Sequence, residues 1–236
     1  MTFNSSTVYS KENLKDLTIN SSWITIQILE KNRELKTNNF YNIARRYIFK
    51  GGLIDAKLIN LVLSHLGHTI NQEELDKLSS IKPVSILFDD LEVINKNKTH
   101  EQIISSSAYN AKLRSKLYVH IGGASTRIAG VYIFTNLKTG EQYVGCSINL
   151  YTRLRSYFTP SILNEGNRQI NKNMKTFGIQ NFKLYIYKID TTGMENSKIR
   201  AVTLCLEQYY IFNLNPSLNS IKVARFNPLV EKRKRK

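Results

Sequence analysis

Three residue types in the second half of the chain suggest chemistry on a phosphodiester: two phenols, a guanidinium and a lone carboxylate. The phenols lie in the tripeptides Gly130–Tyr132 and Tyr143–Gly145. Residues 131–135 have strong strand propensity, 136–141 contain turn-forming Asn and Gly, and a strand resumes at 143. This pattern predicts a β-hairpin with both phenols on one patch. The two glycines would let a bulky partner such as a nucleic-acid backbone approach closely.

The guanidinium lies on the helix predicted to follow the hairpin. Leu150 and Leu154 are four residues apart and should face the core, and Arg153 and Tyr157 share an adjoining face. At 100° per residue, Arg155 lies about 200° from Arg153 around the helix. We therefore expect Arg153 to point at the hairpin patch, and Arg155 to point to solvent.

The carboxylate belongs to Glu207, inside a predicted long helix over 196–214. It is the only acidic residue between Glu195 and Glu231, and apolar residues flank it. A helical glutamate is most often simply exposed, and that alternative stays open. A single carboxylate near phosphate-binding cations is also what a hard divalent cation requires, because magnesium keeps most of its waters and takes other ligands from the substrate.

Further elements must position these groups. Residues 170–175 followed by Gly178 predict a helix, and residues 181–189 alternate as a third strand. The N-terminal part, 1–126, is predicted to be mostly helical, with helices over 38–50 and 53–66, a helix start at Asn71 with Glu74, a short strand over 84–91 and helical propensity over 96–111. We expect a second domain over 127–222 and a basic tail over 223–236.

Charge points to a polyanionic partner. The net charge is +16, and residues 127–236 contain 18 cationic against 6 acidic residues. No apolar segment is long enough to span a membrane, so we expect no membrane partner. The two cysteines form no CxxC pair, which argues against a disulfide framework and a cysteine-built zinc site.

Together, Gly130-Val131-Tyr132, Tyr143-Val144-Gly145, Arg153, Glu207 and Asn219 resemble the GIY-YIG nuclease family. The segments YVGCSINLYTRLRSYF and LEQYYIFNLNPSLN look particularly like intron-encoded homing endonucleases of fungal mitochondria. The resemblance covers about residues 128–222. It implies an α+β fold in which helices flank a three-stranded antiparallel sheet, and a double-stranded DNA endonuclease that needs one divalent metal, Mg²⁺ or Mn²⁺, and no other small-molecule cofactor.

The resemblance also implies roles for single residues. Tyr132 would be the general base, directly or through water, with its pKa lowered by the cationic site, and Arg153 would stabilise charge on the phosphate. Tyr143 would position water or phosphate, and Glu207 would bind the metal. Asn219 would orient Glu207 or the loop near it. Tyr157 stands where some relatives have histidine. Arg155, Lys172 and Lys175 would contact phosphates.

Two questions stay open in the sequence. The chain lacks an import-type leader, and Asn, Ile, Lys and Tyr make up 85 of its 236 residues, a bias typical of AT-rich genomes. We therefore expect an organelle-encoded, mitochondrial protein, although a bacterial or phage genome would show the same bias. The main alternative function is a catalytically inactive GIY-YIG module that binds nucleic acid without cutting it; the oligomeric state is not indicated.

Overall fold

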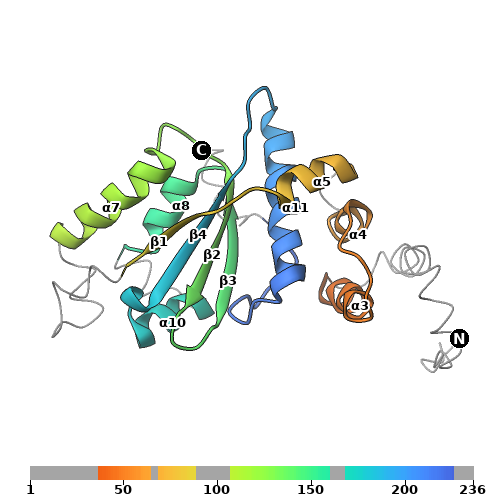
Figure 1. The fold of residues 1–236 in the computed structure, drawn as a ribbon, viewed down its shortest axis with the longest axis horizontal. Coiled ribbons are helices and arrows are strands. Elements are labelled where there is room, and N and C mark those ends of the chain that lie inside the picture. The colour runs from red at the N-terminus through yellow and green to blue at the C-terminus, as the bar shows by residue number, and fades with distance from the viewer. Residues whose placement is uncertain (1–36, 65–68, 89–106, 160–167, 226–236) are drawn as a thin grey trace, which may run out of the picture.

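The computed structural model describes residues 37–64, 69–88, 107–159 and 168–225. Its centre is an antiparallel sheet with the strand order β1-β4-β2-β3 (Figure 1), formed by Val84–Leu87 (β1), Phe182–Lys188 (β4), Gly130–Asn136 (β2) and Gln142–Ser147 (β3). The predicted mixture of helices and antiparallel sheet is confirmed. The three antiparallel strands predicted for residues 127–222 are β2, β3 and β4, and the strand predicted near residue 84 joins them as β1, which pairs with β4.

Seven α-helices accompany the sheet within the described ranges: α3 (Thr37–Phe49), α4 (Ala56–Val62), α5 (Gln72–Ser79), α7 (Ser107–Ile121), α8 (Leu150–Ser156), α10 (Gln169–Phe177) and α11 (Asn196–Leu214). A short 3₁₀ helix, Ile179–Asn181, leads into β4. None of these helices is long and apolar enough to cross a bilayer.

The central strand β2 is buried on both faces, because successive side chains of a strand point in opposite directions. Val131 and Ile133 pack into a core with α11. Tyr132 and Phe134 pack into a second core with α7, α8 and α10. Side chains on the hairpin therefore enter the two cores in alternation, which decides which of them meet α8 and which meet α11.

The long helix α11 lies between the sheet and the N-terminal helices α3, α4 and α5 (Figure 1). It is buried on nearly all sides, from Ala201 to Phe212 with few breaks. On α3, the hydroxyl of Tyr41 donates to Asn215 Oδ1 at 2.8 Å, and Arg45 donates to the Phe212 carbonyl at 2.7 Å. The N-terminal helices thus cover the side of α11 that faces away from the sheet.

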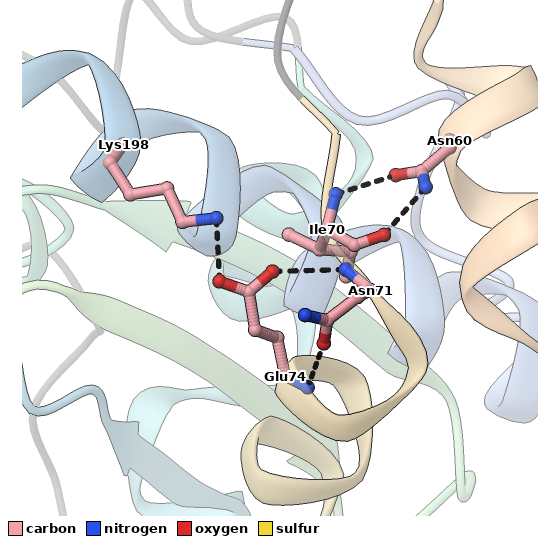
Figure 2. Close-up of polar contacts among 5 residues, drawn as sticks. All are labelled: Asn60, Ile70, Asn71, Glu74 and Lys198. Carbon is pink, nitrogen blue, oxygen red and sulfur yellow. Dashed lines mark hydrogen bonds and ion pairs between the residues drawn. The ribbon is translucent and has the colours of Figure 1, made fainter.

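Glu74 joins the start of α5 to α11 (Figure 2). The side chain of Asn71 accepts from the Glu74 N–H at 2.8 Å, and Glu74 Oε2 accepts from the Asn71 N–H at 2.9 Å, so the predicted capping box is present. Glu74 Oε1 also pairs with Lys198 of α11 at 2.6 Å. One carboxylate therefore both starts α5 and ties it to the helix that carries Glu207.

Some predicted boundaries differ from the observed ones. The helix expected from residue 53 begins at Ala56, because the Asp55 side chain accepts from the Leu58 N–H at 2.7 Å and caps it. Residues 65–66, 89–91 and 96–106 of the predicted elements lie outside the described residues, as does the tail from 226 onward. The helix expected to end near 111 continues to Ile121 as α7, and Gly122 follows it with a φ of 63°.

Candidate active site

The hairpin places Tyr132 directly opposite Gly145, and Tyr143 opposite Phe134. A Cβ added at Gly145 would lie 2.5 Å from the Tyr132 hydroxyl, so the phenol occupies the space that a side chain at Gly145 would fill. Tyr132 is fully buried, whereas Tyr143 is partly exposed. Their ring centroids are 6.4 Å apart, which confirms that the hairpin gathers both phenols in one patch.

Helix α8 presents Arg153 to this patch. The Asn149 side chain caps the helix by accepting from the Thr152 N–H at 3.1 Å, and Leu150 and Leu154 are fully buried. This anchoring leaves Arg153 on the flank that faces β2, where its Nε donates to the Tyr132 hydroxyl at 2.9 Å. The predicted direction of Arg153 is therefore confirmed.

Tyr157, one turn after Arg153, completes a cluster of three phenols around the guanidinium. Arg153 Nη2 donates to the Tyr157 hydroxyl at 3.1 Å, and the guanidinium carbon lies 5.0 Å from the centre of the Tyr157 ring. The hydroxyls of Tyr132 and Tyr157 share a hydrogen bond of 2.9 Å. Both phenol oxygens thus accept from one cation, and one phenol hydrogen remains for a further partner.

Burial controls the acid–base state of this cluster. It raises the pKa of both Tyr132 and Tyr143 well above the ordinary phenol value, while the nearby Arg153 opposes the rise. The expected lowering of the Tyr132 pKa is therefore not found in the ligand-free protein. Burial disfavours the charged form of Arg153, but the surrounding phenols hold its pKa above its usual range, so it stays cationic.

Glu207 projects from α11 toward β3 and is buried, not exposed as a typical helical glutamate is. Its Oε2 has no hydrogen-bond partner, and its carboxyl group lies beside the Cys146 thiol. Burial raises the pKa of Glu207 to about 7, against the lowering effects of a hydrogen bond from Cys146 and the charge of Arg153. The carboxyl group also interacts electrostatically with Tyr143. Glu207 is therefore within electrostatic reach of Tyr143 and Arg153.

Asn219 contacts the edge strand β3 and not Glu207. Its Oδ1 accepts from the Val144 N–H and its Nδ2 donates to the Val144 carbonyl, both at 2.8 Å. The neighbouring Leu218 N–H donates to the Gln142 carbonyl at 3.0 Å. The segment after α11 thus pairs with the free edge of β3, and Asn219 positions the strand that carries Tyr143, Gly145 and Cys146.

The cations predicted to contact phosphates are exposed but lie apart from this cluster. Arg155 is on the outward side of α8, and Lys172 and Lys175 are on the outer face of α10. No hydrogen bond or ion pair between described residues connects them to Tyr132, Arg153 or Glu207. Their contact with phosphates stays a prediction.

Sequence reasoning missed Cys146. A period-two reading of the hairpin would have found it, because Val144 and Cys146 must share a face opposite to that of Tyr143 and Gly145. That face packs against α11, where Glu207 lies. Cys146 is thus a hairpin side chain on the face that meets the helix of Glu207.

The donor set suits a hard cation with few protein ligands. Among the described residues, no group of three or more His, Cys, Asp and Glu side chains is gathered, so an all-protein metal cage is absent there. The unpartnered Oε2 of the buried Glu207 nevertheless offers one strong anionic ligand. Water and substrate oxygens would have to supply the remaining ligands, as is common for magnesium.

Comparison with known proteins agrees with this geometry. Searches of curated proteins and of solved structures found no match. Residues 128–221 match the sequence model of the GIY-YIG catalytic domain, a family of nucleases. The matched segment contains the hairpin, Arg153, Tyr157, Glu207 and Asn219, so this part of the chain is similar to a catalytic domain of nucleases.

Proposed function

We propose that the protein is a double-stranded DNA endonuclease that hydrolyses phosphodiester bonds with one divalent metal, Mg²⁺ or Mn²⁺. The observation that carries the proposal is the environment of Arg153. This partly buried cation makes its hydrogen bonds to phenols, and no carboxylate of a described residue forms an ion pair with it. A cation held in this way needs an anion from outside, and a phosphodiester supplies one.

Arg153 would bind the phosphate oxygens and stabilise the charge that builds on them in the transition state. Its two hydrogen bonds to Tyr132 and Tyr157 hold it in place before substrate arrives. Such preorganised donors cost no reorganisation during the reaction, which is why they are effective. The same contacts would stabilise a phenolate at Tyr132 when it takes part in proton transfer.

Tyr132 would accept a proton from the attacking water, directly or through a second water. The raised pKa of Tyr132 keeps its phenol neutral before substrate binds, so proton transfer also requires the groups that are hydrogen-bonded to it. The shared hydrogen bond with Tyr157 offers a route for that proton. Tyr143, which is the more exposed phenol, would position the water or a phosphate oxygen.

Glu207 would hold the metal through its unpartnered oxygen. A bound divalent cation stabilises negative charge on phosphate and leaving-group oxygens. Asn219 would act indirectly, because it fixes β3 and thereby the positions of Tyr143 and Cys146 relative to α11. Arg155, Lys172 and Lys175 would add phosphate contacts that do not depend on base sequence.

We further propose that the enzyme is an intron-encoded homing endonuclease of a mitochondrion. The support is the likeness of residues 143–158 and 206–219 to that group and the residue usage of an AT-rich genome. The test is cleavage of a DNA that spans an intronless insertion site. A matched DNA that already contains the intron should remain uncut.

The first experiment incubates the purified protein with supercoiled and linear DNA, with and without Mg²⁺ or Mn²⁺. We expect cutting only with metal, and no cutting by Glu207→Gln or Arg153→Ala. Arg155→Ala, on the outward side of the same helix, should weaken DNA binding but leave the cutting of bound DNA close to the wild-type rate. A wild type that binds but never cuts any DNA would support the inactive nucleic-acid-binding module instead.

A further inference from the structure

Cys146 lies on the face of β3 that packs against α11, the helix that carries Glu207. Besides burial, which raises the pKa of both groups, the Glu207 carboxyl group raises the pKa of the Cys146 thiol, the thiol lowers the pKa of the carboxyl group, and Arg153 lowers both. Glu207 Oε2 is buried and has no partner among the described residues. A sulfur and an unused anionic oxygen therefore lie together beside the cation of the proposed active site.

Cys146 is also reachable from outside. It is partly exposed, whereas Cys205, the only other cysteine of the chain, is completely buried. Cys205 is two residues before Glu207 on α11, so it points about 200° away around the helix. Its electrostatic partners are Lys198 and Glu74, on the side of the N-terminal helices. Only the sulfur of Cys146 can therefore bind the same cation as Glu207.

We propose that the thiol of Cys146 is a second protein ligand of the cation that Glu207 binds, so that this site also takes a thiophilic divalent cation such as Zn²⁺ or Cd²⁺. The inference rests on the metal site of the proposed function. Soft sulfur ligands favour such cations over Mg²⁺, which prefers oxygen. The cation binds the thiolate, so the thiol proton passes to solvent when the cation is coordinated.

The rest of the coordination shell would come from outside the protein. Among the described residues no third His, Cys, Asp or Glu joins the pair. Water and phosphate oxygens would fill the open positions, as in catalytic sites that keep part of their shell for substrate. The sulfur would therefore set which cation binds most tightly without closing the site to DNA.

The test is a titration of the full chain with Cd²⁺, followed by the ultraviolet charge-transfer absorption of the sulfur–cadmium bond. We expect one equivalent of Cd²⁺ to produce the band in wild type and in Cys205→Ala. Cys146→Ser keeps a small polar side chain at this position but has no sulfur, so it should show no band. We expect it to bind Cd²⁺ about tenfold more weakly and to bind Mg²⁺ within about twofold of wild type by calorimetry. Glu207→Gln should weaken the binding of both cations.

The outcomes separate this inference from the proposed function. No band in folded wild type, or a band that survives Cys146→Ser, overturns the sulfur ligand even if the protein cuts DNA with Mg²⁺. An equal loss of Mg²⁺ and Cd²⁺ affinity in Cys146→Ser also overturns it, because the residue would then only position Glu207. A cysteine-dependent band in a protein that never cuts DNA keeps the metal site and rejects the nuclease. Circular dichroism confirms that each variant is folded.

Discussion

Arg153 Nε donates a hydrogen bond of 2.9 Å to the hydroxyl of Tyr132, and these two residues come from different elements, α8 and β2. Tyr132 is fully buried, so Arg153 reaches inward and does not lie along the surface. The contact joins the two groups to which we assign charge stabilisation and proton transfer. Several consequences of this arrangement can be measured.

The first prediction compares the two phenols that Arg153 contacts. Tyr157→Phe keeps the ring beneath the guanidinium and removes one hydroxyl, so we expect cleavage to fall about tenfold. Tyr132→Phe also removes the proposed proton acceptor, and we expect a fall of about 100-fold or more. Single-turnover cleavage of a plasmid measures both rates. A larger loss for Tyr157→Phe would assign the base to Tyr157.

The second prediction concerns stability and pH at Glu207. Its pKa rises from 4.5 when unfolded to about 7 when folded, so the folded protein holds the proton more tightly. This group therefore stabilises the fold fully below pH 4.5, and the contribution disappears as pH rises through 7. The loss is up to about 3 kcal/mol. Glu207→Gln lacks this titration and should be more stable than wild type at pH 8.

Urea unfolding without metal at pH 5 and pH 8 measures this difference. We expect the advantage of Glu207→Gln to be larger at pH 8 than at pH 5. An advantage that is the same at both pH values would mean that the carboxylate is not buried as described. The burial of Glu207 would then not lower the stability of the folded protein.

The third prediction concerns the close approach at Gly145. Alanine there would place a Cβ 2.5 Å from the Tyr132 hydroxyl, so either the phenol or β3 must move. We expect a loss of about 1–3 kcal/mol in stability, and little cutting because the contact with Arg153 breaks. Gly123→Ala is the control, since its Cβ would lie 3.4 Å from the Tyr118 ring, an ordinary contact. Equal behaviour of the two variants would contradict the packing of Tyr132.

The local parts of the site were predictable from the sequence, because local chemistry determines them. Strand propensity and the turn residues after Thr135 predicted the hairpin, and the leucine spacing of α8 predicted the direction of Arg153. Asn71 and Glu74, which are three residues apart, predicted the start of α5. In each case the interacting groups are close in sequence, so propensity and spacing carry the information.

Parts that depend on distant partners were not predictable. Val84 of β1 pairs with Ile186, and Tyr41 binds Asn215, across more than a hundred residues in both cases. Burial by other elements raises the pKa of Tyr132, and no local pattern in the sequence indicates which elements bury it. The role of Cys146 was not predictable either, because it depends on which face of β3 meets α11.

The fourth prediction concerns the pairing of Asn219 with β3. Asn219→Ala would leave the N–H and the carbonyl of Val144 without their 2.8 Å partners in a buried position. We expect a stability loss of about 1–3 kcal/mol and slower cutting, because β3 carries Tyr143. Ser220→Ala, at the exposed next residue, should change little. Unfolding curves and cleavage rates of the two variants provide the comparison.

The last prediction separates the two tasks of Glu74 (Figure 2). Glu74→Ala removes both the hydrogen bond to the Asn71 N–H and the ion pair with Lys198, whereas Lys198→Ala removes only the ion pair. The pair is about one-third exposed on each side, so we expect Lys198→Ala to cost less than about 1 kcal/mol. Glu74→Ala should cost about 1–2 kcal/mol, because the helix cap is lost as well. Glu73→Ala removes the exposed pair with Lys77 and should be nearly neutral. Equal losses for Glu74→Ala and Lys198→Ala in urea unfolding would show that the contact with α11, and not the cap, makes Glu74 important.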